Sequence, residues 1–163
     1  MEIIQALLKE MDQEAATTRK MLSRVPEDKY DWQPHPKSMK MLRLATHIAE
    51  LPGWVTMAIH TDGLDFQANP YKPVVLKNAA ELMEYFETTL ADGRKNLEAV
   101  SLSRLDEPWT LSDGDQVLVK QTVGEMIRVA YSQIVHHRAQ LGVYLRLLDI
   151  PIPGSYGPSA DEY

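Results

Sequence analysis

Two of the five histidines in this chain occupy the inner faces of predicted helices, where side chains from separate segments can meet. His47 and His137 each lie in a segment whose apolar residues recur every three or four positions, as they do on one face of a helix. A buried imidazole is either a neutral ring hydrogen-bonded within the core or a metal ligand. Because helical bundles commonly build metal sites from facing helices, both interpretations remain open for this pair.

A catalytic zinc-type site uses three protein ligands and leaves one position for water or substrate, so a third donor is required. Gln133 precedes His137 by one helical turn and therefore projects from a similar side of the helix. Glu50 follows His47 by three residues, where a carboxylate can bind a metal or orient the imidazole, and we also expect it to contact a substrate. Arg138 stands beside the predicted site, where it is expected either to bind an acidic substrate or to form an interface salt bridge.

The other three histidines have simpler interpretations. His136 points about 100° away from its neighbour on the helix and is expected at the surface or an interface. His35 lies between two prolines in a predicted loop, and His60 lies at a helix end, where a cation suits the helix dipole. The chain contains neither a Gly-rich phosphate loop nor a GxSxG elbow, and a serine triad around Ser132 lacks an acid to orient it.

Four predicted helices position these residues. An apolar stripe over residues 3–25 predicts the first helix. Pro34 and Pro36 enforce a loop after it, and Ser38 is the candidate N-cap of the second helix. Pro52 interrupts the apolar pattern of this second helix, so we expect the helix to kink or restart there.

The third predicted helix follows a long connection. Residues 61–77 contain Gly and Pro residues that disfavour regular structure, and their number suits a crossover loop rather than a tight turn. Asn78 and Glu81 have the spacing of a capping box and mark the start of the helix. Gly93 is expected to weaken this helix near its middle.

The fourth helix has the clearest pattern, and it follows a predicted hairpin. The pair Asp113-Gly114 between two apolar runs indicates a small two-stranded ribbon. Thr122 and Glu125 then form a second candidate capping box, and Pro151 ends the helix. We therefore predict an all-α fold in a single domain over residues 1–163: an antiparallel four-helix bundle with a long crossover loop and a small β-hairpin before the last helix.

The composition limits the partners of the chain. A net charge of -6 among 163 residues opposes binding to nucleic acid and to anionic membranes. No stretch approaches the roughly 18 apolar residues of a membrane span, and charged residues interrupt the N-terminal segment where a signal peptide would need an apolar run. The absence of cysteine rules out disulfides and thiolate ligands. We expect a soluble, unprocessed, cytoplasmic protein with no nucleic-acid or membrane partner.

Several segments together resemble the DinB/YfiT-like family. Residues 133–146 resemble its fourth-helix signature, and residues 44–54 resemble its second helix. Residues 32–39 and 156–162 are also similar, so the resemblance covers essentially the whole chain. It implies a four-helix bundle, commonly paired as a homodimer. It also implies a divalent metal, zinc or nickel, held by three histidines, one from the second helix and two from the fourth.

This chain departs from the implied ligand set at one position. His47 and His137 match two of the ligands, but Gln133 stands where the family usually has histidine. A neutral amide oxygen is a weaker ligand for zinc or nickel than an imidazole nitrogen. Three outcomes are open: Gln133 binds the metal weakly, water or Glu50 or a tail residue fills the gap, or the site holds no metal.

The resemblance implies a metal-dependent enzyme of the thiol transferase and isomerase type, which acts on a small molecule with a thiol such as bacillithiol or mycothiol. With no cysteine in the chain, the sulfur has to come from that cosubstrate. The alternative, based on Gln133, is a metal-free homodimer on the same scaffold with a binding or structural role.

Overall fold

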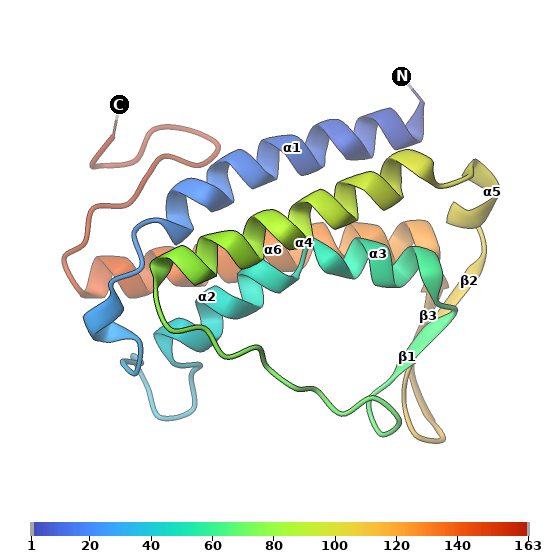
Figure 1. Ribbon diagram of the computed structural model, residues 1–163, viewed down its shortest axis with the longest axis horizontal. Helices are drawn as coiled ribbons and strands as arrows, with labels where there is room; N and C mark the ends of the chain where they lie inside the picture. Colours follow the sequence, from blue (N-terminus) through green and yellow to red (C-terminus); the bar gives the residue numbers. More distant parts are fainter. Residues whose placement is uncertain (1, 163) are drawn as a thin grey trace.

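The computed structural model describes residues 2–162, and the fold of this part is mostly helical (Figure 1). Its α-helices are α1 (Ile3–Leu22), α2 (Met41–Glu50), α3 (Gly53–His60), α4 (Ala79–Ala99), α5 (Leu102–Leu105) and α6 (Val123–Leu147), with a 3-10 turn η1 (Glu27–Lys29) after α1. Its strands are β1 (Gly63–Asp65), β2 (Pro108–Asp113) and β3 (Gln116–Thr122). The prediction of an all-α fold is therefore imprecise, because these strands form a small sheet.

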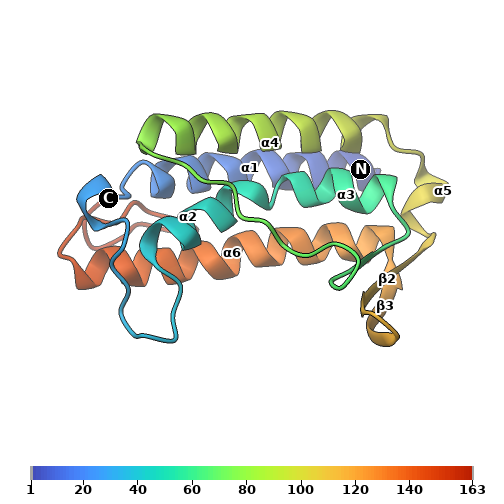
Figure 2. The same cartoon turned by 60° about the horizontal axis from the view of Figure 1, so that its bottom comes forward.

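The long helices α1, α4 and α6 lie side by side with the pair α2–α3 (Figures 1 and 2). Helices α1 and α6 run in one direction along the molecule, and α2, α3 and α4 run in the other (Figure 1). Their inward faces bury the apolar stripes seen in the sequence, and this burial is the main source of stability for amphipathic helices. The largest fully buried side chains in these helices are Leu22, Met41, Leu44, Ile48, Leu82, Phe86, Leu97, Ile127, Tyr131 and Leu141.

The expected interruption of the second helix is present at Pro52, which separates α2 from α3. The break brings the backbone of Pro52 against α4 at Gly93, where a Cβ atom would lie 2.4 Å from the Pro52 carbonyl oxygen. Gly93 therefore permits this close approach of two helices, in addition to weakening α4 through its conformational freedom.

The predicted N-cap of the second helix is wrong. The cap position is Lys40 rather than Ser38, and its side chain makes no capping bond. The first amides of α2 are satisfied by the preceding loop instead, because Met41 N donates to the carbonyl of Trp32 at 2.8 Å. Leu42 N donates in the same way to the carbonyl of Tyr30. Backbone groups from the loop thus replace the side-chain cap.

The predicted N-cap residues of the other two helices are confirmed, but the capping box is complete only at α6, because at α4 the Glu81 carboxylate accepts from Lys77 N rather than from Asn78 N. The Asn78 side chain accepts a hydrogen bond from Glu81 N at 2.8 Å at the start of α4. At the start of α6, Glu125 N donates to Thr122 Oγ1 and Thr122 N donates to the Glu125 carboxylate, which completes a capping box. These local signals are readable because donor and acceptor are three residues apart.

The sheet contains the predicted hairpin and one strand that the sequence did not reveal. β2 and β3 pair antiparallel around Gly114, whose φ of 58° is the left-handed conformation that such a turn favours. β1 pairs parallel with β2 and lies within the expected crossover loop. A Cβ atom at Gly63 would lie 2.3 Å from the Thr110 carbonyl oxygen, so glycine lets β1 approach its neighbour.

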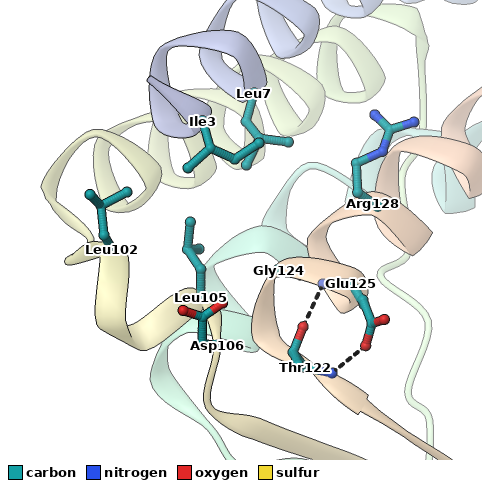
Figure 3. A pocket seen from close by; sticks show the side chains of 9 residues that line it. All are labelled: Ile3, Leu7, Leu102, Leu105, Asp106, Thr122, Gly124, Glu125 and Arg128. Carbon is teal, nitrogen blue, oxygen red and sulfur yellow. Dashed lines mark hydrogen bonds between the residues drawn. The ribbon is translucent and has the colours of Figure 1, made fainter. Parts of the chain in front are cut away.

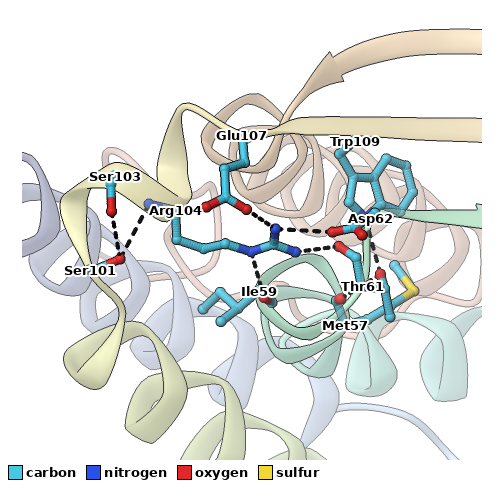
Figure 4. Close-up of polar contacts among 9 residues, drawn as sticks. All are labelled: Met57, Ile59, Thr61, Asp62, Ser101, Ser103, Arg104, Glu107 and Trp109. Atoms are coloured by element: carbon cyan, nitrogen blue, oxygen red, sulfur yellow. Dashed lines mark hydrogen bonds and ion pairs between the residues drawn. The ribbon is translucent and has the colours of Figure 1, made fainter.

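Arg104 of α5 fixes the sheet to the end of α3 (Figure 4). Its guanidinium donates hydrogen bonds to the carbonyl oxygens of Ile59 at 2.8 Å and Thr61 at 2.7 Å, which α3 leaves unpaired. Trp109 of β2 donates from Nε1 to Thr61 Oγ1 at 3.1 Å. The sheet and α3 are thereby held together on one side of α6.

No helix within residues 2–162 has both the length and the apolar character needed to cross a membrane.

The contact at Gly93 gives a test of the packing. Gly93→Ala is expected to lower the free energy of unfolding by about 1–3 kcal/mol, because the new methyl group forces α4 away from Pro52. Gly53→Ala is the control: its Cβ would meet Thr89 at an ordinary 3.7 Å, so a gain of about 0.4–1 kcal/mol is expected. Urea denaturation of both variants measures the difference. Equal stability of the two would contradict the close approach.

Candidate functional site

His47 of α2 and His137 of α6 face each other across the interface of their helices. Their ring centroids lie 4.5 Å apart in an edge-to-face arrangement, and both side chains are buried. The two segments are separated by ninety positions in the sequence, and the packing of α2 on α6 brings them together. The structure therefore places both residues where a single small ligand can contact both rings.

Each ring is oriented through its Nδ1 atom. Glu50 Oε1 lies 2.5 Å from His47 Nδ1, and Gln140 Oε1 lies 3.0 Å from His137 Nδ1. A carboxylate or amide oxygen accepts, so Nδ1 carries the proton in both rings. Among residues 2–162, no side chain or backbone group hydrogen-bonds to Nε2 of either ring. The lone pair of a neutral ring is then available at Nε2, as in histidines that bind metals.

Glu50 is engaged on both of its oxygens. While Oε1 orients His47, Oε2 accepts a hydrogen bond from the Tyr71 hydroxyl at 2.8 Å. Burial and the Glu50 carboxylate raise the pKa of Tyr71, so the hydroxyl keeps its proton and continues to donate. These contacts make Glu50 a positioning residue for His47, and they leave neither oxygen free for a substrate.

Arg43 belongs to this cluster, and the sequence reasoning missed it. It precedes His47 by one turn of α2, and its guanidinium lies 4.5 Å from the centre of the Tyr71 ring. Burial is the largest cause that lowers the pKa of His137. The hydrogen bond to Gln140 raises this pKa, whereas the charges of His47, His136 and Arg43 lower it. The His137 ring is therefore neutral at pH 7. Arg43 precedes His47 by four residues, and this helical spacing could have identified it in the sequence as a neighbour of His47.

Gln133 lies one turn before His137 on α6 and is partly buried. Within residues 2–162, the side-chain amide of Gln133 has no hydrogen bond to another side chain. It lines an apolar hollow of about 300 Å³ between α3, α6 and the sheet. Trp54 also lines this hollow and packs edge-on against His47, with centroids 5.7 Å apart. The hollow therefore adjoins the histidine pair through Gln133 and Trp54. Its remaining lining residues are Met57, Leu64, Phe66, Trp109, Leu111, Val119, Gln121, Met126 and Val129.

A three-ligand site made only of histidine or carboxylate is not present among residues 2–162, where no group of three or more such residues is arranged to hold a metal. The other histidines lie outside the pair. His136 is exposed beside His137, His60 bonds to Asn96, and His35 accepts a hydrogen bond from the backbone of its own loop. The pair of His47 and His137 therefore needs a donor of another kind, and Gln133 is the residue of the expected set that remains.

Arg138 has a different environment from the one predicted. Its side chain is 3% exposed and forms an ion pair with Glu14 at 2.7 Å. It also donates to Thr18 Oγ1 at 3.1 Å and to the Tyr156 hydroxyl at 2.9 Å. Tyr156 in turn donates to the Glu14 carboxylate, so the C-terminal segment is tied to α1, beside which it lies in Figure 1. The guanidinium is thus used within the interior, which corrects its expected role in binding a substrate.

A separate hollow of about 340 Å³ lies among α1, α5 and the start of α6 (Figure 3). Leu7, Leu102 and Leu105 line it, together with the Thr122–Glu125 capping box. None of the residues predicted for the site contributes to its wall. Of its polar residues, Thr122 and Glu125 form the capping box, and Arg128 forms an ion pair with Glu10.

The sequence matches one known family. The profile of the DinB family matches residues 2–163 of the chain. Among curated proteins, the uncharacterized protein YrdA of Bacillus subtilis (strain 168) is 25% identical over 160 residues, which cover 96% of this chain and 89% of YrdA.

Solved structures share the fold. The DinB-like protein YjoA of Bacillus subtilis superposes with a TM-score of 0.68 at 19% identity, over 90% of this chain and 95% of YjoA. A DinB-like protein from Bacillus cereus ATCC 10987 gives 0.69 at 16% identity, over 92% and 95% of the two chains. A mycothiol-dependent maleylpyruvate isomerase gives 0.63 at 12% identity, over 86% of this chain and 61% of the isomerase. At these identities the likeness establishes the fold alone.

The structural role of Arg138 can be measured. Arg138→Met is expected to lower the free energy of unfolding by about 3–5 kcal/mol, because Glu14 is left charged in the interior. Arg24→Ala, which breaks an exposed ion pair with Glu162, is the control and is expected to cost at most about 1 kcal/mol. Urea denaturation gives both values, and a similarly small cost for the two variants would contradict the structural role.

Proposed function

Because this chain belongs to the DinB family, we propose that it is a metal-dependent enzyme that holds a divalent ion, zinc or nickel, between α2 and α6. The observation that supports this is the 4.5 Å approach of the His47 and His137 rings, each held at Nδ1 by an acceptor with Nε2 left free among residues 2–162. Imidazole nitrogen suits both metals. The proposed scaffold is a four-helix bundle in which α2 and α3 serve as one interrupted helix.

The residues present fit two of three protein ligand positions. We assign the third position to the amide oxygen of Gln133, one turn before His137. This oxygen is neutral and binds zinc or nickel less tightly than imidazole, so the proposed site has a lower affinity than one with three histidines. Glu50 supports the site indirectly, because its hydrogen bond fixes the tautomer and orientation of His47.

The proposed reaction class is transfer or isomerisation with a low-molecular-weight thiol such as bacillithiol or mycothiol. A bound divalent ion lowers the pKa of a thiol and favours the thiolate. The chain has no cysteine, so the sulfur nucleophile comes from the cosubstrate. Trp54 and the other apolar residues of the hollow beside Gln133 exclude water and are placed to bind the apolar part of the acceptor molecule. The similarity of the fold to that of the mycothiol-dependent maleylpyruvate isomerase supports this reaction class.

A second candidate is favoured by Gln133 and by the absence of a three-residue cluster of histidine and carboxylate within residues 2–162. In this candidate the chain is a metal-free homodimer with a binding or structural role. His47 and His137 then serve as neutral core residues, held by Glu50 and Gln140. The two candidates differ in whether the free Nε2 atoms ever bind an ion.

Metal analysis of protein purified without a histidine tag separates the candidates. The wild type is expected to bind about one zinc or nickel per chain, and His137→Ala is expected to weaken binding by at least about 100-fold, since loss of a direct ligand exceeds the loss of an orienting group. His35→Ala, in an exposed loop, is the matched control and should bind as the wild type does.

The variant Gln133→His provides the second arm of this experiment. If the proposed enzyme is correct, this variant tightens a site that already binds metal. Tight binding by the variant, with none by the wild type under any loading condition, would instead establish the metal-free candidate.

We also propose that the chain forms a homodimer through the outer face of α6. Val143 and Leu147 are exposed on this helix and lie four residues apart, which places them on one side. Burying such a face between two copies removes apolar surface from water. Light scattering is expected to give the mass of two chains, and Leu147→Glu is expected to give one chain with unchanged helical content. A wild-type mass of one chain at micromolar concentration would contradict the dimer.

A further inference from the structure

Arg43 is the exception among the arginines of this chain. Of the eight arginines, seven form ion pairs with carboxylates within residues 2–162, and Arg43 forms none. The paired residues are Arg19, Arg24, Arg94, Arg104, Arg128, Arg138 and Arg146. A chain with an excess of acidic residues has thus left one guanidinium without a partner, in the cluster around the histidine pair.

One nitrogen atom of the Arg43 guanidinium lacks a hydrogen-bond acceptor. Arg43 Nη1 is buried from solvent and has no hydrogen-bond acceptor among the described residues. A buried donor without an acceptor is costly, and native structures rarely retain one without a functional reason. An acceptor supplied from outside the chain would remove this cost.

The neighbours of Arg43 hold it in place and leave it unneutralised. The Tyr71 ring packs against its guanidinium at 4.5 Å, which orients the plane of the group. The nearby carboxylate of Glu50 is occupied, because one oxygen binds His47 Nδ1 and the other accepts from the Tyr71 hydroxyl. Arg43 precedes His47 by one turn of α2, and its charge contributes to the lowered pKa of His137, so the guanidinium belongs to the surroundings of the histidine pair.

We propose that Arg43 binds a carboxylate group of the substrate beside the histidine pair. A guanidinium offers two parallel N–H donors that match the two oxygens of a carboxylate. One positive charge close to Glu50 balances a single negative charge better than the double charge of a phosphate. The identification of the bound molecule as a substrate rests on the proposed function. The substrate of the proposed enzyme would then be a small carboxylic acid.

The position of Arg43 also suits a ligand that reaches the histidines. Arg43 and His47 are one turn apart on the same face of α2, so an acid held by the first extends along the helix to the second. Tyr71 belongs to the exposed stretch 66–75 of the crossover segment, which runs past α2 in Figures 1 and 2. The side chain that packs against the guanidinium is thus itself about half exposed to solvent.

The test measures binding of small acids to full-length protein freed of metal by a chelator, so that no ion competes for the acid. Acetate, succinate and benzoate are titrated while the side-chain N–H signals of ¹⁵N-labelled arginine are followed by NMR. Succinamide, benzamide and inorganic phosphate are the comparison probes. At least one acid is expected to shift the Arg43 signal in a saturable way, and its neutral amide is not.

The variants decide whether Arg43 itself is responsible. Arg43→Gln is expected to weaken binding of that acid at least tenfold, and Arg43→Lys to retain part of it through charge alone. Arg94→Gln, which alters an exposed guanidinium paired with Asp12, is the matched control and should bind as the wild type does. Equal binding by Arg43→Gln, tighter binding of phosphate than of every acid, or no saturable shift with any acid would overturn the proposal. The wild-type titration decides even if a variant fails to fold.

The same experiment separates this inference from the proposed function. Arg43→Gln is expected to keep the metal affinity of the wild type while it loses the acid. A chain that binds the acid at Arg43 and never binds metal would contradict the proposed enzyme and support the anion site. A chain that binds metal but no acid would support the proposed enzyme and contradict the anion site at Arg43.

Discussion

The contact between α2 and α6 determines the organisation of the candidate site, because it buries two imidazole rings against each other. A buried ring N–H without a partner is costly, so the N–H of each ring has to find an acceptor. Glu50 and Gln140 meet this requirement at Nδ1, each from the same helix as its partner and three residues along. The orientation of both rings is thus set within single helices, and only the distance between the rings depends on the tertiary packing.

Arg138, which is buried, and Arg43, which is partly buried, have opposite surroundings. Arg138 is saturated: Glu14 neutralises it, and Thr18 and Tyr156 bind its remaining donors, so it joins α6 to α1 and to the C-terminal segment. Arg43 has an aromatic ring against its face and no anion. Removing a partner from a buried ion pair is expensive, whereas a guanidinium that never had one is ready to accept a ligand. The first arrangement stabilises the fold, and the second leaves binding capacity beside the histidines.

The sequence predicted features that depend on neighbours three or four residues apart. The caps at Asn78 and Thr122, the hairpin at Gly114 and the break at Pro52 all follow from local backbone chemistry. Features that depend on distant partners were missed. β1 has three residues and no periodicity, and it exists because Gly63 can pack against β2. For the same reason the partner of Arg138 could not be predicted, since Glu14 lies on α1.

Gln133 occupies the boundary between two environments, and this explains how one side chain suits both candidate functions. On one side stands the histidine pair, to which it is related by a single turn of α6. On the other side is the apolar hollow that it lines with Trp54. A histidine here would add a strong ligand, whereas glutamine supplies a neutral amide that can bind a metal weakly or contact a bound molecule. Glutamine at this position therefore places a neutral polar group in the wall of an apolar hollow, one helical turn from His137.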